Sequence, residues 1–274
     1  MLIFSPCKIN IGLNIINKRE DSFHNLKSVF YPVPLYDILE IVKNKNKNAQ
    51  PIEFKTSGLE INGNFTDNIV FKAIELLKED YKIAPIKIHL HKVIPMGAGL
   101  GGGSANGANT LLIVKELFGL NIPFNKLLNY AAKLGSDCPF FIYNSPCIVE
   151  GRGEKITPIE LDLSRKYLTL IYPHIHINTR VAFSKIIPSD KNINFKEINK
   201  LDIKEWQHIF VNDFEKPMCE LFPELNNIIS SLKDSGAEFV SMTGSGSAIY
   251  AMSNNTLNVS NLNKSNNFIF QTKL

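Results

Sequence analysis

The sequence contains few cysteines and no long apolar run, and each of these two features argues against a class of protein. The four cysteines lie far apart and form no C-x-x-C pair, so their spacing favours neither a zinc site nor a disulfide scaffold. No apolar stretch approaches the ~18 residues that a membrane-spanning helix needs. Residues 1–16 are apolar but lack the cationic start and the cleavage site of a signal peptide. We therefore expect a soluble, cytoplasmic protein with reduced thiols.

A strong surplus of one charge is also missing. Lys and Arg number 30 and Asp and Glu number 26, which is too small an excess for a nucleic-acid footprint. The densest basic run, KNKNKN at 43–48, is interpreted as a solvated turn rather than a recognition patch. With 44% hydrophobic residues over 274 positions, the chain can form one large globular domain or two of ordinary size. We expect a small anionic molecule as partner, neither nucleic acid nor membrane, and a monomer or weak homodimer.

The first half of the chain alternates between strand and helix patterns. Apolar and polar residues alternate over 7–16, which predicts a half-buried strand with Lys8 and Asn10 on its polar face. The other elements expected here are broken strands around Pro32 and Pro34, clearest at 36–42, a helix at 67–81 capped by Asp67 or Asn68, a strand at 86–94, a buried helix after the glycine-rich stretch, a helix at 123–134 ended by Gly135, and short strands within 137–143 and 146–159.

From about residue 160 the pattern starts again. We expect a strand at 166–173, an amphipathic segment around Phe183, helices near 196–210 and 223–234, strands at 238–242 and 247–252, and a terminal apolar stretch at 267–274. The segment 253–267 is rich in asparagine and serine, which disfavour helix. The whole reads as an α+β protein of two lobes, 1–155 and 156–274.

Six of the fifteen residues at 95–109, PMGAGLGGGSANGAN, are glycine. Because glycine has no Cβ, successive N–H groups can turn inward and form a nest that binds anions. A helix that begins directly after the nest adds its N-terminal dipole and further N–H donors. The hydroxyl of Ser104 can reach a phosphate oxygen or a metal ion. This stretch therefore predicts a phosphate site, with a closely packed structural turn as the alternative.

Two better-known phosphate motifs fit this stretch poorly. A P-loop needs a lysine before its Ser or Thr, and here Gly103 precedes Ser104. Gly97, Gly99 and Gly102 do satisfy G-x-G-x-x-G. However, that motif belongs to the first βαβ unit with an acid about 20 residues on, and the candidate Glu116 falls inside the following helix.

Three separated segments resemble the three motifs of the GHMP kinases, the family of galactokinase and of the homoserine, mevalonate and phosphomevalonate kinases. The segments are PCKINIGLNI at 6–15, PMGAGLGGGSANGA at 95–108 and MTGSGSAIYA at 242–251. Further segments at 18–41, 67–77, 133–142, 150–159 and 211–215 are similar to members that act on a substrate carrying a cytidine diphosphate group. Three motifs in the family order are far more specific than one glycine run.

The resemblance implies both a fold and a set of cofactors. The fold would combine an N-terminal lobe like ribosomal protein S5 domain 2 with a ferredoxin-like C-terminal lobe. ATP would be the phosphoryl donor, accompanied by a largely hydrated Mg²⁺ rather than a metal held by protein ligands. The residues that the resemblance assigns to ATP binding are Pro95, Met96, Gly97, Ala98, Gly99, Leu100, Gly101, Gly102, Gly103, Ser104 and Ala105.

The resemblance also assigns the catalytic pair, Lys8 and Asp137. A substrate hydroxyl has a pKa far above 7, so a positioned carboxylate must accept its proton as it attacks. A nearby ammonium would keep that carboxylate ionised and stabilise the phosphoryl oxygens. The residues alone also allow plainer interpretations: Asp137 as the N-cap of a helix with Pro139 in its first turn, and Lys8 as a solvated strand lysine.

The cytidine end of the substrate is expected at DSFH, residues 21–24. By resemblance, the ring of Phe23 stacks on cytosine and His24 hydrogen-bonds the edge of the base. Phe183 would supply the second ring, with ordinary core packing as its alternative. Thr179 and Asn10 would be polar contacts. The family usually has glycine where Ser22 stands here, which puts the geometry of this turn in question.

Several other features allow more than one interpretation. The pairs HLH at 89–91 and HIH at 174–176 lack a third metal ligand nearby, so we interpret them as surface decoration. TGSGS at 243–247 is either a turn near the phosphates or a purely structural hairpin turn. Two other functions stay open. One is another kinase of the family, for homoserine or mevalonate, and the other is a non-catalytic nucleotide-binding protein on the same fold.

Overall fold

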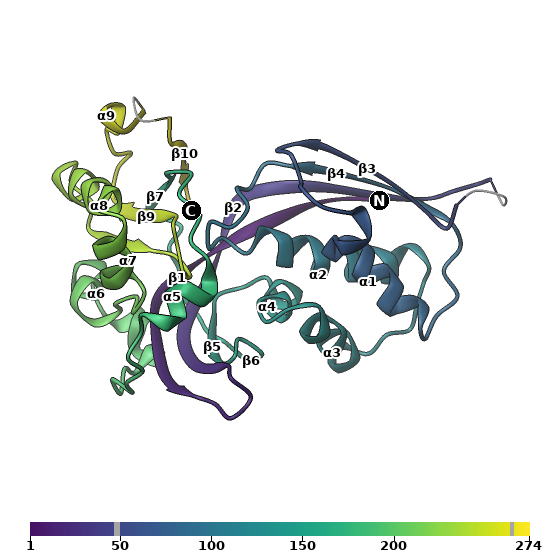
Figure 1. Ribbon diagram of the computed structural model, residues 1–274, viewed down its shortest axis with the longest axis horizontal. Coiled ribbons are helices and arrows are strands. Elements are labelled where there is room, and N and C mark those ends of the chain that lie inside the picture. Colours follow the sequence, from purple (N-terminus) through teal and green to yellow (C-terminus); the bar gives the residue numbers. More distant parts are fainter. Residues whose placement is uncertain (47–49, 264–265) are drawn as a thin grey trace. The chain divides into compact units, whose positions relative to one another are not determined.

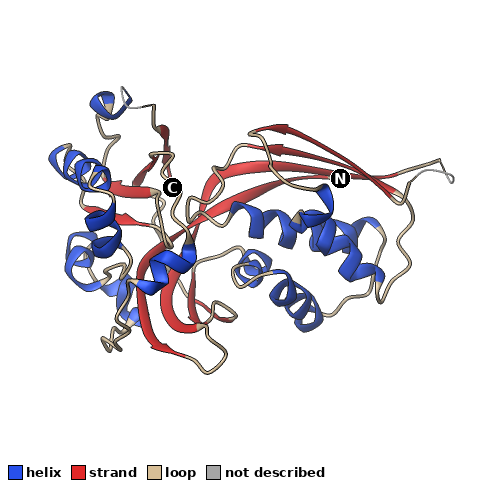
Figure 2. Ribbon diagram, viewed as in Figure 1, coloured by secondary structure: helices blue, strands red, loops and turns tan. Residues whose placement is uncertain are grey.

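The computed structural model describes residues 1–46, 50–263 and 266–274. Its residues fall into two compact units. The first unit contains 1–7, 35–95 and 101–144, and the second contains 8–34, 96–100 and 145–274. The chain forms helices and two β-sheets, which confirms the α+β class (Figures 1 and 2). The expected division into lobes at residue 155 stays a prediction.

In the first unit, helices cover one face of a strand group (Figure 1). Strand β4 pairs in parallel with β3 and antiparallel with the C-terminal half of β2. Along β4, buried Ile86, Ile88 and Leu90 alternate with more exposed side chains, as a half-buried strand requires. The elements of this unit are β3 (Ile52–Gly58), β4 (Ile86–Lys92), α1 (Ile69–Lys78), α2 (Gly102–Leu117), α3 (Phe124–Leu134), α4 (Cys138–Tyr143) and the short 3₁₀ helix at Phe65–Asp67.

Helix α2 forms the centre of this unit. It packs against α1, α3 and α4, and it is buried over most of its circumference, as predicted. Asn68 caps α1 by accepting a hydrogen bond from Val70 N at 2.9 Å. Gly135 follows the last residue of α3, where the sequence predicted the stop.

In the second unit, an antiparallel sheet of order β10-β7-β9-β8 carries α6, α7 and α8 on one face (Figure 1). Its core combines sheet residues such as Ile171, Ile249 and Ala251 with Leu225 and Leu232 of α8. The remaining bounds are β5 (Cys147–Gly151), β6 (Lys155–Pro158), β7 (Tyr167–Tyr172), α5 (Thr179–Ser184), the 3₁₀ helix at Phe195–Lys200, α6 (Ile203–Ile209), α7 (Glu215–Leu221), α8 (Glu224–Asp234), β8 (Phe239–Met242), β9 (Ile249–Ser253), α9 (Ser260–Asn263) and β10 (Phe268–Lys273).

Strands β1 (Leu2–Lys18) and β2 (His24–Lys43) each pass from one unit into the other along the chain. The expectation of strands broken at Pro32 and Pro34 is wrong, because β2 is continuous through both prolines. β2 pairs with β5 over residues 26–30 and with β4 over 38–43. The prolines fall between these segments, so neither pairing needs their missing N–H groups.

Burial corrects a second expectation. β1 is buried on both faces from Ser5 to Ile15 rather than half-buried. Its supposed solvent face packs against the second unit's own elements: a Cβ on Gly12 would lie 3.0 Å from side-chain atoms of both Phe195 and Phe210. Alternation of apolar and polar residues located the strand correctly, but the partners of its polar face come from distant parts of the sequence.

Residues 138–143 form helix α4 and not the expected strand. A six-residue apolar run fits either structure by pattern alone. Pro139 in the first turn and burial of five of the six residues favour the helix here. The structure also replaces the single helix expected near 196–210 with two shorter ones, because Asp202 and Glu205 start α6 with a capping box. Helix α7 was not predicted.

The polar segment 253–267 contains little helix where the structure describes it, whereas Lys43 at the start of the charged run belongs to β2. Between β9 and β10 the only helix among the described residues is α9, with four residues, and positions 264–265 lie outside the described residues. In the run 43–48, positions 47 and 48 lie outside the described residues as well.

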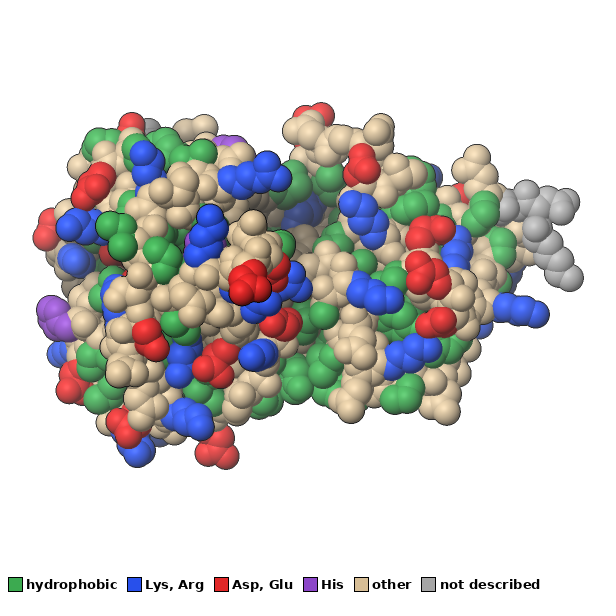
Figure 3. Space-filling model, turned by 60° about the horizontal axis from the view of Figure 1, so that its bottom comes forward, with side chains coloured by type: hydrophobic (Ala, Val, Ile, Leu, Met, Phe, Trp, Pro, Cys, Tyr) green, Lys and Arg blue, Asp and Glu red, His purple; other side chains and the backbone are tan. Residues whose placement is uncertain are grey.

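On the face in Figure 3, positive and negative side chains intermingle, and no large area carries charge of one sign. No described helix is long and apolar enough to cross a bilayer.

Candidate active site

Lys8 lies in the second unit and is buried, with 3% of its surface exposed. Its Nζ donates a hydrogen bond to Asn10 Oδ1 at 2.6 Å and stands 4.7 Å from the centre of the Phe30 ring. A buried ammonium is costly unless other groups compensate its charge. The interpretation of Lys8 as a solvated strand lysine therefore does not fit, and its position needs a specific purpose.

Asn10 connects Lys8 to the third motif. Asn10 is fully buried, and its Oδ1 also accepts hydrogen bonds from Gly244 N at 2.8 Å and from Thr243 Oγ1 at 3.1 Å. Its Nδ2 donates to Ser28 Oγ at 3.1 Å. These contacts hold the carboxamide oxygen in one orientation, and with it the ammonium of Lys8. A direct contact between Asn10 and substrate stays a prediction.

The turn at 243–247 lies directly against the second-unit part of the glycine loop. Gly99 has φ +80°, and a Cβ at this position would come within 2.1 Å of Thr243 O. Ala248 N donates to Ala98 O at 3.2 Å, and Lys8 N donates to Leu100 O at 2.9 Å. The second and third motifs thus share one packed surface, which favours the interpretation of this turn as part of the site.

The other part of the glycine loop belongs to the first unit and opens α2. Gly101 precedes the helix in the left-handed conformation, with φ +71°, and the helix itself begins at Gly102. The first N–H groups of a helix have no partner within it, so the amides of 102–104 are donors suited to an anion. The start of α2 inside the glycine run is what the anion-nest interpretation requires.

Asp137 also lies in the first unit. It occupies the N-cap position of α4, but its side chain makes no capping hydrogen bond. The capping alternative is therefore correct for the position and wrong for the side chain. Asp137 is half-buried, and Lys8 belongs to the other unit, so their approach stays a prediction.

Cys138, which sequence reasoning missed, connects α4 to the loop. Its thiol is buried near the hydroxyl of Ser104, and burial raises the pKa of Cys138 to about 12. The helix that carries Asp137 is thereby joined to the first turn of α2. A buried cysteine gave no signal in the sequence, because its partner is 34 positions away.

The residues expected at the cytidine end lie in the second unit. Phe23 is 52% exposed at the tip between β1 and β2, and the guanidinium of Arg152 lies 4.8 Å from the centre of its ring. His24 stacks on Phe183, with ring centres 4.7 Å apart and planes at 21°. Burial, with the nearby charge of Lys18, lowers the pKa of His24.

These contacts bring two of the expected residues together and add a third. Phe183 faces His24, and the described contact of Phe23 is with Arg152. Thr179 is exposed at the start of α5. Arg152 was not predicted, although it lies in the segment 150–159 that resembles the family. Thr243 was likewise quoted within its motif without a role.

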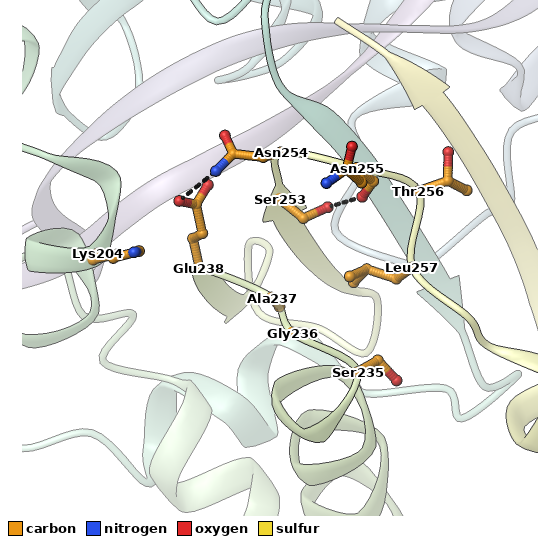
Figure 4. A pocket seen from close by; sticks show the side chains of 10 residues that line it. All are labelled: Lys204, Ser235, Gly236, Ala237, Glu238, Ser253, Asn254, Asn255, Thr256 and Leu257. Carbon is orange, nitrogen blue, oxygen red and sulfur yellow. Dashed lines mark hydrogen bonds between the residues drawn. The ribbon is translucent and has the colours of Figure 1, made fainter.

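A polar depression of about 520 Å³ lies elsewhere in the second unit (Figure 4). Residues 235–238 and 253–257 line it together with Lys204, and none of the predicted site residues does. Some of its polar groups bond to one another: Asn254 Nδ2 donates to Glu238 Oε1 at 3.0 Å, and Ser253 Oγ to Asn255 O at 2.6 Å. Lys166, outside the lining, also donates to Glu238 and Asn254. This depression is not a candidate for the chemistry.

Comparison with known proteins gives consistent matches. The models of the "GHMP kinases N terminal domain" and "GHMP kinases C terminal" families match residues 68–145 and 194–262. A 4-diphosphocytidyl-2-C-methyl-D-erythritol kinase of Bacteroides fragilis is 42% identical over 274 residues, covering all of both chains. That of Bacteroides thetaiotaomicron is 43% identical over 252 residues, covering 92% of each. A crystal structure of 4-(cytidine 5'-diphospho)-2C-methyl-D-erythritol kinase matches with TM-score 0.80 and 28% identity, covering 92% of this chain and 90% of the other.

Proposed function

The chain belongs to the GHMP kinase family, and we propose that it transfers the γ-phosphate of ATP to the 2-hydroxyl of 4-diphosphocytidyl-2-C-methyl-D-erythritol. Kinases of this family use ATP as phosphoryl donor. The observation that carries the proposal is likeness to a kinase of that substrate, at 42% identity over 274 residues that cover all of both chains. The reaction would supply the non-mevalonate route to isoprenoid precursors.

In this reaction Asp137 would act as the base and Lys8 as its electrostatic partner. The carboxylate accepts the proton of the attacking hydroxyl as the bond to phosphorus forms. The ammonium, held by Asn10 at 2.6 Å, stabilises the oxygens of the transferred group. The amides of residues 97–104 receive the phosphate oxygens of ATP. Nothing covalent between enzyme and substrate is needed, because position and charge lower the barrier.

Recognition of the cytidine group would depend on exposed aromatic surface. Phe23 is about half exposed at the tip between β1 and β2, where a base can stack. Phe183 supplies a second ring, and His24, now stacked on Phe183, would turn to the edge of the base. Thr179 lies on the same helix as Phe183 and would add a polar contact.

Mg²⁺ would accompany ATP and neutralise charge on its phosphates. Among the described residues no group of three His, Cys, Asp or Glu side chains is placed to hold a metal ion. The ion would be held mainly by phosphate oxygens and water, with the Ser104 hydroxyl as a nearby oxygen ligand.

The proposal is tested by measuring ADP release with the cytidine-containing substrate and, for comparison, with homoserine and mevalonate. Wild-type protein should turn over 4-diphosphocytidyl-2-C-methyl-D-erythritol in preference to homoserine or mevalonate. Replacement Asp137→Asn should lower kcat at least about 100-fold, equivalent to about 3 kcal/mol, because it removes the proton acceptor but keeps the shape. Turnover by Asp137→Asn at the wild-type rate would contradict the assignment of the base.

The same substrate panel separates the alternatives. Equal activity on homoserine or mevalonate would identify another small-molecule kinase of the family, for which Phe23 has no use. Binding of ATP without turnover of any alcohol would indicate a non-catalytic nucleotide-binding protein.

A further inference from the structure

A buried ion pair in the first unit has no part in the mechanism above. Asp37 on β2 is fully buried, and Lys92 at the end of β4 is 3% exposed. The ammonium of Lys92 donates to Asp37 Oδ2. Burial lowers the pKa of Lys92, and the charge of Asp37 opposes this effect. Because a buried charge pair is often no more stable than apolar side chains of the same size, its presence calls for a specific reason.

The carboxylate of Asp37 accepts hydrogen bonds from residues on both sides of the glycine loop. On the strand side, its Oδ1 accepts hydrogen bonds from the amides of Val93 at 2.8 Å and Ile94 at 2.9 Å. On the helix side, Asn106 Nδ2 in α2 donates to Oδ2 at 3.0 Å. These three donors, with Lys92, come from the last residues before the loop and from the second turn after it.

Lys92 itself lies against the first residue of α2. A Cβ on Gly102 would come within 3.0 Å of Lys92 Nζ and within 2.8 Å of Ile94 Cγ2. An ammonium beside the positive end of a helix is unfavourable unless a nearby negative charge offsets it. Asp37 provides that charge and at the same time determines where the ammonium and the strand end can lie.

We propose that Asp37 is a positioning residue for the nucleotide. Its carboxylate holds the end of β4 and the N-terminus of α2 in the arrangement in which the amides of 102–104 can bind phosphate oxygens. Asp37 does not touch the nucleotide in this account. The inference rests on the proposed function, since it takes those amides to bind ATP.

Replacement Asp37→Asn tests the idea with little change in shape. The amide oxygen can still accept from Val93 and Ile94, but its NH₂ group then faces Lys92 and Asn106, donor against donor. We expect the affinity for a non-hydrolysable ATP analogue, measured by calorimetry without the alcohol substrate, to fall at least about tenfold. The milder Asn106→Ala, which removes one donor and no charge, should weaken binding about threefold.

Asp213 offers a matched control in the second unit. Its carboxylate side chain is 8% exposed, pairs with the more exposed Lys191, and accepts from Asn14 Nδ2 at 3.0 Å and from Ile15 N at 2.7 Å. Asp213→Asn should lower the thermal midpoint as Asp37→Asn does, yet leave the affinity for the analogue within about twofold of wild type.

Selective loss of analogue affinity in Asp37→Asn and Asn106→Ala would support the proposal. It would be overturned if both variants, folded by circular dichroism, bound the analogue like wild type, or if Asp213→Asn weakened binding equally. If Asp37→Asn does not fold, the affinity of Asn106→Ala for the analogue decides whether the proposal holds. Wild-type protein that binds the analogue but phosphorylates no alcohol would defeat the proposed function and leave this inference standing.

Discussion

Ser22 has the left-handed backbone conformation that glycine adopts without strain. Its φ is +66°, in a turn closed by hydrogen bonds from Ser22 N to Arg19 O at 3.2 Å and from Arg19 N to Phe23 O at 2.8 Å. A serine held in this conformation carries about 1 kcal/mol of local strain.

Replacement Ser22→Gly should raise the free energy of unfolding by about 0.5–1 kcal/mol, because the strain disappears while the turn remains. Urea denaturation measures the change. Ser184→Gly is the matched control: this serine lies in helix α5, where glycine is unfavourable, and stability should fall by a similar amount. A decrease in stability for both variants would contradict the argument from strain.

At the scale of elements, the loop and the turn of the third motif are built against each other. Gly99 allows the carbonyl of Thr243 to approach its Cα, and Asn10 accepts hydrogen bonds from the same turn. The turn therefore provides a rigid support for residues 97–100 within the second unit. Rigid support matters because an anion site made of amides works only when these donors are already in place.

Replacement Gly99→Ala should cost at least about 2 kcal/mol of unfolding free energy, because a Cβ at 2.1 Å from Thr243 O must displace backbone. Gly103→Ala is the contrasting variant. A Cβ there meets no atom within 4 Å, and the residue lies inside α2. Alanine should raise stability by about 0.5–1 kcal/mol, measured by urea denaturation. Similar losses for both would mean that close approach is not what selects glycine at 99.

At the scale of the whole molecule, the two units share two continuous strands, β1 and β2. Neither unit can lose its strands without breaking an element of the other, so we expect them to unfold together. All four cysteines are buried, with Cys7 and Cys138 in the first unit and Cys147 and Cys219 in the second. The rate at which each thiol is modified therefore reports on the opening of the unit that contains it.

Thiol labelling tests this expectation. Burial raises the pKa of Cys138 to about 12, and of Cys147 and Cys219 to about 11, so at pH 8 these native thiols stay protonated and unreactive. In moderate urea all four should be modified at one rate, that of global unfolding, followed by mass spectrometry of the labelled peptides. Two distinct rates, one for each pair, would show that the units open independently.

Much of the fold could be predicted because its signals are local. The strand at β4, the Asn68 cap of α1 and the Gly135 stop of α3 each depend on neighbouring residues. The prediction failed for α4, where a short apolar run fits strand and helix equally. It also failed for the solvent face of β1, whose covering residues are almost 200 positions away.

The sequence by itself determined the family, since three motifs in the family's order leave little choice, and with it the candidate residues Lys8 and Asp137. Only the tertiary structure decided that Lys8 is buried and oriented by Asn10, that Asn10 is held by a turn more than 230 residues away, and that Asp37 and Lys92 form a buried pair. Local patterns depend on backbone geometry over a few residues, whereas the burial and pairing of a polar group depend on which distant segments the folded chain brings against it.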